Sequence, residues 1–520
     1  MTLGRFFSDS RDAGREEDAE MQAPRDEASV LPVGVNALLT LTTDSLIIQG
    51  KAIPGCHSYF FFFLSLICHI HCHILYIFLK YISVARVTRS IPFFNILWAE
   101  ISDNHININY ANPRNKLDVG LATVCYSIER TQLSRAETWA ASLLDLAYGE
   151  AQKKKRIKVL VNPFGGKGNA SKIYYKEVEP IFEAANCVIE TQITEYSGHA
   201  IEIAEKIDVD AWDVIAAASG DGSIFEIFNG LGKKENAGEA LAKLAVAHIP
   251  CGSGNAMSRN LNGTAGPSMA ALCIIKGLRT PLDLVSISHG QRRTISFLSQ
   301  AFGIVADSDL GTDNLRWMGP ARFTIGFLIR LFGNTVYPCD VALKVEIDDK
   351  KRIKEHYNAV VQNKSNAEPR EEIPESGGLP PLRYGLATDP IPDDWMRISH
   401  DKLGNFYSGN MAFMSQDANF FPASLPNDGF LDVIMIRGDI SRLTAVQMLG
   451  ALEDGELFDL PDVHALKISA FRITPRNPED GYISIDGEQI PYEPFQAEVH
   501  KGLGTVISRS GFKYETGKGS

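Results

Sequence analysis

Three glycine-rich turns, each placed between an apolar run and a helix-like segment, constrain the fold of this chain more than any other feature. The apolar runs before them are 157–161, 214–218 and 244–248, and such continuous runs are typical of strands buried on both faces of a parallel sheet. Strands that alternate with helices favour βαβ units. Because ligands of such sheets bind beyond the carboxyl ends of the strands, we expect the three turns to converge at one sheet edge.

The residue types in these turns suit phosphate chemistry. The first turn, Asn-Pro-Phe-Gly-Gly-Lys-Gly at 162–168, is neither a P-loop nor a dinucleotide fingerprint. Its glycines let backbone N–H groups approach phosphate oxygens, and the next helix start favours negative charge. The second turn, Ser-Gly-Asp-Gly at 219–222, presents Asp221, which can bind Mg²⁺ or accept a proton from a hydroxyl. The third is Gly-Ser-Gly-Asn at 252–255. Each of these glycine motifs alone is more often an ordinary turn. Three of them at one edge of one sheet are much harder to explain as coincidence.

Together with Glu-Ile-Phe-Asn-Gly-Leu at 226–231 and Pro-Cys-Gly-Ser-Gly-Asn-Ala at 250–256, these turns resemble the diacylglycerol-kinase catalytic superfamily, and within it the sphingosine kinases. The resemblance implies an α/β nucleotide-binding domain at 151–280 and a C-terminal β-sandwich domain at 281–512, with the active site in the cleft between them. It further implies ATP and Mg²⁺ as cofactors, and a sphingoid long-chain base whose primary hydroxyl accepts the phosphoryl group.

The same resemblance assigns roles to single residues. Asp221 is the expected catalytic residue and, with Glu488 of the Ile485-Asp-Gly-Glu segment, an expected metal ligand. Asp309 is expected to hold the cationic amine of the lipid, because a carboxylate selects an ammonium that diacylglycerol lacks. The expected nucleotide-binding residues are Asn162, Gly165, Gly166, Thr194, Ser219, Gly220, Gly222, Glu226, Gly252, Ser253, Gly254, Asn255, Arg316, Arg322 and Glu488.

Some positions carry a second interpretation. Arg316 and Arg322 match positions that clamp the ATP phosphates, although charge alone favours ordinary surface arginines. Phe164 stands where some relatives carry a basic residue, so one nucleotide contact is in doubt. His199 also matches a family position, but a structural role for it is favoured.

The chain before the catalytic region reads as three parts. Residues 1–30 are predicted to be disordered, because they hold too few large apolar side chains to form a core. Residues 31–150 suggest a small β-rich module that resembles a pleckstrin-homology domain, or any other small β-rich domain. An apolar insert at 51–88 interrupts this module. Its segment Tyr59–Leu79 is long enough to cross a membrane, but we favour a gene-model artefact, and a zinc site of its cysteines and histidines is a minor alternative.

The region after residue 280 is again β-rich, with Asn363–Asp394 predicted as a disordered insertion. One helix is predicted over Ala170–Ala185. The predicted late strands are Leu282–Ser288, Ile295–Phe302, Val341–Ile347, Tyr357–Val361, Asn410–Met414, Phe430–Ile436, Lys467–Thr474 and Gly481–Ile485, and the predicted late helices are Asp313–Phe332 and Ile440–Glu453.

Composition narrows the function classes. A formal net charge of −12 argues against nucleic-acid binding, which needs a basic face. The eight cysteines form no disulfide framework and the start is polar, which favours a cytoplasmic protein that visits membranes peripherally. No protein partner is indicated. A diacylglycerol or ceramide kinase, a non-enzymatic lipid-sensing adaptor and a damaged gene product remain the alternatives.

Overall fold

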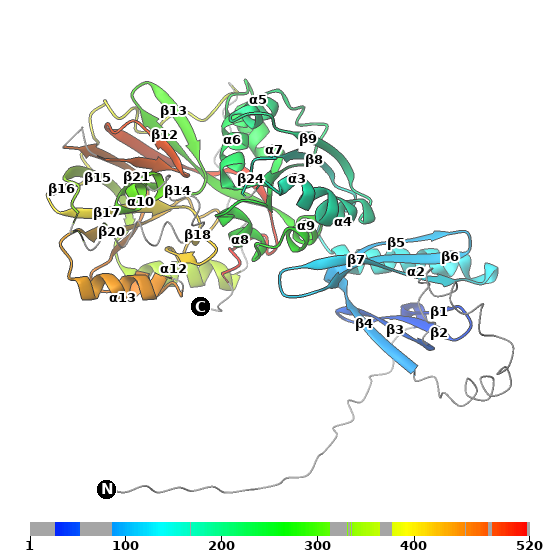
Figure 1. Cartoon of the computed structure of the whole chain (residues 1–520). Helices are drawn as coiled ribbons and strands as arrows, with labels where there is room; N and C mark the ends of the chain where they lie inside the picture. Colours follow the sequence, from blue (N-terminus) through cyan, green and yellow to red (C-terminus); the bar gives the residue numbers. More distant parts are fainter. Residues whose placement is uncertain are drawn as a thin grey trace, which may run out of the picture. The chain divides into compact units, whose positions relative to one another are not determined.

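The computed structural model describes residues 27–51, 86–166, 168–311, 330, 333, 335–363, 377–452, 454–476 and 481–516 (Figure 1). Several predictions therefore lie outside the described residues, namely the disordered terminus before residue 27, most of the apolar insert, the helix Asp313–Phe332 except for residue 330, and the two arginines Arg316 and Arg322. No helix among the described residues is long and apolar enough to cross a membrane. The chain divides into two compact units, which are described separately.

The first unit contains an antiparallel sheet with the strand order β1-β2-β3-β4. Its strands are β1 Val30–Val33, β2 Ala37–Leu41, β3 Ser45–Lys51 and β4 Arg86–Pro92. Lys51 pairs with Arg86, so the strands on either side of the apolar insert form one hairpin. The insert predicted at 51–88 is therefore shorter than expected, because residue 51 and residues 86–88 belong to paired strands.

The N-terminal region continues with a second sheet and one helix. Strands β5 Ile96–Ser102, β6 His105–Pro113 and β7 Val119–Ser127 form a three-stranded sheet. Helix α2, Leu133–Tyr148, follows, and within it Trp139 Nε1 donates a hydrogen bond to Ser29 O at 3.1 Å. The prediction of a β-rich region closed by a helix is confirmed, while its likeness to a pleckstrin-homology domain stays a prediction.

The second unit contains a parallel sheet in the order β11-β10-β8-β9. Its strands are β8 Arg156–Val161, β9 Val188–Ile193, β10 Val214–Ser219 and β11 Ala245–Pro250, and its helices are α3 Ala170–Ile173, α4 Glu179–Ala184, α5 His199–Lys206, α6 Asp221–Gly232, α7 Ala237–Lys243, α8 Ala256–Asn262 and α9 Pro267–Lys276. Every residue of β10 and β11 is buried, which explains their uninterrupted apolar sequence.

The helix predicted over Ala170–Ala185 is not regular throughout. A π-helical turn, Tyr174–Val178, separates α3 from α4. Pro180 occupies the first turn of α4. Because proline has no backbone N–H, the turn before it cannot keep the ordinary helical bonding pattern, and a wider turn takes its place.

The β-rich part of the second unit surrounds a long strand, β24. Its strands are β12 Leu278–His289, β13 Arg292–Ser296, β14 Ser299–Gly303, β15 Cys339–Ile347, β16 Met396–His400, β17 Leu403–Gly409, β18 Phe413–Ser415, β19 Ala418–Asn419, β20 Leu431–Arg437, β21 His464–Pro475, β22 Ile483–Ile485, β23 Glu488–Ile490 and β24 Phe495–Ser508, and its helices are α10 Ile304–Leu310, α12 Lys350–Asn363 and α13 Arg442–Leu452. Along β20, Val433 and Ile434 pack into different hydrophobic clusters, so both faces of this strand are buried.

Strand β24 joins the two halves of this unit into one sheet. It pairs antiparallel with β12 and β21. Near its end, Val506 pairs parallel with Val246 of β11. The strand order along the sheet is therefore β23-β22-β14-β17-β20-β21-β24-β11-β10-β8-β9. This continuity fixes the carboxyl edge of the parallel strands relative to the β-rich part.

Several predictions for the β-rich part are wrong. The predicted strand Ile295–Phe302 is divided between β13 and β14, and only the last two residues of Asn410–Met414 belong to a strand, β18. Tyr357–Val361 lies in α12 and not in a strand, since Ile353 and Tyr357, four residues apart, place one helical face in a hydrophobic cluster. In the predicted disordered insertion, residues 377–394 pack against the sheet. Arg383 N donates to Glu498 Oε1 at 2.9 Å, and Arg472 Nη1 donates to Asp389 O at 2.6 Å. Residues 364–376 lie outside the described residues.

Candidate active site

The first glycine turn follows β8 and is held by Asn162. The Asn162 side-chain oxygen accepts the Phe164 N–H at 3.0 Å, and its carbonyl accepts the Gly165 N–H at 3.1 Å. Gly166 has φ +59°, and a Cβ there would lie 2.4 Å from Cys251 O. Only glycine permits this close approach, so the first and third turns lie in direct contact.

The second turn connects β10 to α6, and the third connects β11 to α8. A Cβ added at Gly252 would lie 2.4 Å from the Gly220 Cα, so these two turns also touch through their backbones. The third turn is closed by Asn255 at φ +53°. Its Oδ1 accepts the Gly252 N–H at 2.9 Å and its Nδ2 donates to Gly252 O at 2.8 Å. Ser253, between them, is exposed. The predicted convergence of the three turns is confirmed.

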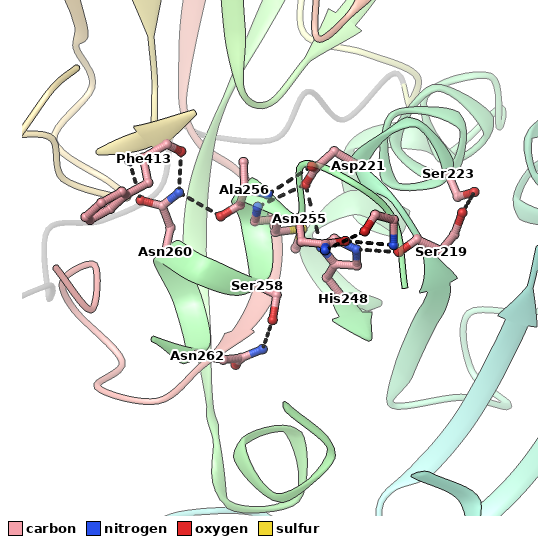
Figure 2. A network of polar contacts seen from close by, with 12 residues as sticks. Ser219, Asp221, Ser223, His248, Asn255, Ala256, Ser258, Asn260, Asn262 and Phe413 are labelled. Atoms are coloured by element: carbon pink, nitrogen blue, oxygen red, sulfur yellow. Dashed lines mark hydrogen bonds and ion pairs between the residues drawn. The ribbon is translucent and has the colours of Figure 1, made fainter. Parts of the chain in front are cut away.

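Asp221, the first residue of α6, points at the start of α8 (Figure 2). Its Oδ2 accepts the Ala256 N–H at 2.9 Å and its Oδ1 accepts the Met257 N–H at 3.0 Å. The carboxylate therefore satisfies two amides that would otherwise lack partners in the first turn of α8. A carboxylate has about four acceptor positions, so both oxygens can still bind a hydroxyl or a cation.

The end of β10 contributes further polar groups beside Asp221. Ser223 Oγ donates to Ser219 Oγ at 2.8 Å. His248 of β11 lies with its Nδ1 3.6 Å from Asp221 Oδ1 and its Nε2 3.0 Å from Ser219 O. Sequence analysis missed His248, because its position inside an apolar strand gives no local signal of a partner.

Asp309 and Glu488 come from the β-rich part and meet at the turn 485–488. Ser484 Oγ donates to Asp309 Oδ2 at 3.0 Å, and a Cβ at Gly487 would lie 3.8 Å from the same oxygen. A Cβ at Gly222 would lie 3.9 Å from Glu488 Oε1. Glu488 therefore stands between the Asp221 turn and Asp309, so the structure brings the three predicted acidic residues into one region.

Burial raises the pKa of the Glu488 carboxyl, and the negative charge of Glu226 raises it further. The intervening residue Asp486 is buried, with φ +52°. Its carboxylate accepts hydrogen bonds from the Ser296 hydroxyl at 2.6 Å and the Ser299 N–H at 2.8 Å. These bonds fix the turn on the edge of β14 and thereby position Glu488.

Two predicted nucleotide-binding residues form hydrogen bonds with other parts of the protein. The Glu226 carboxylate accepts the Gly198 N–H at 2.8 Å and the Ala200 N–H at 3.2 Å, so it caps the start of α5. Thr194 is buried after β9, where its N–H donates to Val161 O at 2.9 Å. His199 Nδ1 accepts the Glu195 N–H at 3.1 Å, a structural contact.

A magnesium site is not preformed in the described part of the chain, where no group of three or more histidine, cysteine, aspartate or glutamate side chains gathers around one point. Asp221 and Glu488 nevertheless offer carboxylate oxygens, which are the donors that Mg²⁺ prefers, and Mg²⁺ usually completes its shell with phosphates and water. The residues present fit a metal that arrives with the nucleotide.

Comparisons with known proteins decide the family. Residues 156–287 match the diacylglycerol kinase catalytic domain, and residues 406–508 match the YegS C-terminal NAD kinase beta sandwich-like domain. The chain is 34% identical to Sphingoid long chain base kinase 4 of Schizosaccharomyces pombe, over 82% of this chain and 90% of that protein. The chain belongs to the sphingoid long-chain base kinase family.

The comparisons show three further similarities. The kinase is 33% identical to Sphingoid long chain base kinase 5 of Saccharomyces cerevisiae, over 79% of this chain and 68% of that protein. A diacylglycerol kinase structure from Bacillus anthracis is 19% identical, with a TM-score of 0.48, over 69% of this chain and 98% of that one. Residues 29–149 match Domain of unknown function (DUF7493). The predicted family, α/β catalytic domain and β-sandwich are confirmed, and the protein is an ATP-dependent lipid kinase.

We expect Gly252→Ala to impair nucleotide binding in this kinase. Its Cβ would meet the Gly220 backbone at 2.4 Å from Cα and 2.9 Å from N, so the second and third turns must separate. Such overpacking typically costs about 1–3 kcal/mol of stability, and we expect the KM for ATP to rise about tenfold as the phosphate-binding amides move apart. Steady-state kinetics and a thermal melt measure both effects. Gly450→Ala is the control, since a Cβ there meets nothing within 4 Å. An unchanged KM in Gly252→Ala would contradict the need for this contact.

Proposed function

We propose that this kinase transfers the γ-phosphoryl group of ATP to the primary hydroxyl of sphingosine or a related sphingoid long-chain base. One observation carries the substrate proposal. Asp309 lies beside the 485–488 turn, and that turn also places Glu488 next to the start of α6. A carboxylate in the same region as the catalytic turn suits a lipid whose reactive hydroxyl and cationic amine are close neighbours.

Asp221 is proposed to accept the proton of the lipid hydroxyl. The two amides of α8 hold its carboxylate in one orientation, so the oxygen that receives the proton is already placed when the substrate binds. The hydroxyl O–H bond breaks as the oxygen forms a bond to the γ-phosphorus, the proton passes to Asp221, and the bond to the ADP oxygen breaks.

The glycine turns are proposed to hold the nucleotide. Their backbones meet at the carboxyl ends of β8, β10 and β11, where amide N–H groups can donate to phosphate oxygens. Mg²⁺, held by Asp221 and Glu488, would neutralise phosphate charge. Arg316 and Arg322 are proposed to contribute positive charge to the same phosphates, and both lie outside the described residues.

The substrate proposal is tested by competition. The full chain is given ATP labelled in the γ-phosphate, together with equal amounts of sphingosine and diacylglycerol in mixed micelles, and both products are quantified. We expect most of the label on sphingosine, because Asp309 attracts only the lipid that carries an amine. Label mainly on diacylglycerol or ceramide would keep the kinase assignment but overturn the substrate proposal.

Peripheral association with membranes is proposed on the chemistry of the substrate alone. A sphingoid base carries a long apolar chain and resides in a bilayer, so the enzyme must visit the bilayer surface to collect it. Sedimentation of the full chain with sphingosine-containing vesicles tests this step.

A further inference from the structure

Two helices of the catalytic part, α6 and α8, are each joined to the β-rich part by one asparagine. In α6, Asn229 Nδ2 donates to Phe225 O, four residues earlier in the helix, at 2.9 Å and to Ile295 O at 2.8 Å. Its Oδ1 accepts the Ile295 N–H at 2.9 Å. Both N–H groups and the oxygen of the amide are therefore used, and the side chain is matched to a single residue of β13.

Asn260 of α8 repeats this arrangement, and its side chain is completely buried (Figure 2). Its Nδ2 donates to Ala256 O at 2.8 Å and to Phe413 O at 2.7 Å, and its Oδ1 accepts the Phe413 N–H at 2.9 Å. Asparagine is a poor residue for a helix interior, because its side chain competes for backbone hydrogen bonds. The same costly arrangement in both helices needs an explanation. The pair Asn229–Ile295 is the α6 bracket, and the pair Asn260–Phe413 is the α8 bracket.

The α6 bracket connects the helix that carries Asp221 to the strand that positions Glu488. Helix α6 begins at Asp221. On the other side, Ile295 lies in β13, and the next residue, Ser296, donates through its Oγ to Asp486 Oδ1 at 2.6 Å. That bond helps to fix the turn from which Glu488 projects. One bracket therefore holds the helix of one acidic site residue against the support of another.

The α8 bracket connects the support of Asp221 to the strands that lead to Asp309. The first turn of α8 supplies the two amides that orient the Asp221 carboxylate. On the other side, Phe413 begins β18, which follows β17 along the chain. Strand β17 pairs with every residue of β14, and β14 leads directly into α10, which carries Asp309. The two brackets thus act on the two acidic residues that the β-rich part contributes.

Apolar packing alone does not fix the two parts relative to each other. Residues of α6, α8, β13 and β18 belong to one hydrophobic cluster, in which the rings of Phe228 and Phe297 lie 5.5 Å apart. Hydrophobic contact is non-directional, so it holds two surfaces together but tolerates a small lateral shift. Each bracket requires three hydrogen bonds in one geometry. The brackets therefore determine the lateral position of the helices.

We propose that Asn229 and Asn260 are positioning residues for the phosphoryl transfer, which set the place of Asp221 relative to Glu488 and Asp309. The inference rests on the proposed function, in which the glycine turns hold ATP and Asp309 holds the lipid. Each substrate is then bound by one part of the unit, and only the alignment of the two depends on the brackets. A misplacement of about 1 Å can lower a rate by about a hundredfold. Both asparagines act through their backbone partners.

The test is a comparison of kcat with KM in Asn229→Ala and Asn260→Ala, each made in the full chain. We expect kcat per folded molecule to fall about tenfold to a hundredfold in each variant, because the bound substrates are no longer aligned. The KM values for ATP and sphingosine should stay within about twofold of the unmodified enzyme. The folded fraction is measured by thermal unfolding. Asn229 is only half-buried, so Asn229→Ala keeps the test valid if Asn260→Ala does not fold.

Asn95→Ala is the matched control for this experiment. Asn95 is also buried, and its Nδ2 donates to a backbone carbonyl, Ala111 O, at 2.6 Å, but it lies in the N-terminal region. We expect this variant to melt at a lower temperature and to keep its kcat. An unmodified enzyme that phosphorylates neither lipid would refute the proposed function. An active enzyme would refute only the role of the brackets if the folded variants turn over at the normal rate, or if Asn95→Ala loses as much kcat as they do.

Discussion

Asp221→Asn is expected to lower kcat by about a thousandfold or more, because general-base catalysis contributes about 10²–10⁴ and the amide cannot accept the hydroxyl proton. The structure adds a second consequence. The Ala256 and Met257 amides both donate to Asp221, and an asparagine can offer them only one oxygen. Its NH₂ group would face an N–H donor, so we also expect a loss of about 1–2 kcal/mol of stability from the start of α8. Turnover with labelled ATP and thermal unfolding measure the two effects separately.

Asp283→Asn is the matched control for the stability effect. The Asp283 carboxyl also accepts two backbone amides, from Gly429 and Gly502, each at 2.6 Å, but in the β-rich part. We expect this variant to change the melting temperature and to keep its turnover per folded molecule. Normal turnover in folded Asp221→Asn would show that another group takes the proton, and would remove the catalytic role.

Features that depend on neighbouring residues in the sequence could be predicted. The buried strands and the glycine turns are local signals, because a turn that touches another backbone admits only glycine, as at Gly166 and Gly252. The topology of parallel strands then places all such turns at one edge. This is why the region around Asp221 was predictable from residue types alone.

Features that depend on distant partners could not be predicted. Residues 377–394 look like a solvated loop, yet Arg472 and Glu498 bind them from strands about a hundred positions further along the chain. Glu226 was assigned to the nucleotide by the resemblance to the kinase family, whereas its carboxylate caps α5. His248 sits in an apolar strand, and only the fold shows which carboxylate it faces.

Asp309→Ala is expected to reduce kcat/KM for sphingosine by about a hundredfold while the KM for ATP stays within about twofold. Removing one member of a charged, hydrogen-bonded pair typically costs about 2–5 kcal/mol, since the ammonium of the lipid would be left without its partner. Diacylglycerol has no ammonium, so any rate with diacylglycerol should change little. The measurement is the ratio of kcat/KM for the two lipids in parallel assays of the variant and the unmodified kinase.

The loss in Asp309→Ala has two possible origins, charge and shape, and Asp309→Asn separates them. The asparagine oxygen can still accept the hydrogen bond that Ser484 Oγ donates at 3.0 Å, so α10 should keep its place against β22. Only the negative charge is lost. If the carboxylate recognises the amine by charge, Asp309→Asn loses most of the sphingosine rate that Asp309→Ala loses. If Asp309→Asn keeps the normal rate, Asp309 serves to hold α10 in place, and the selection of an amine must come from another part of the lipid site.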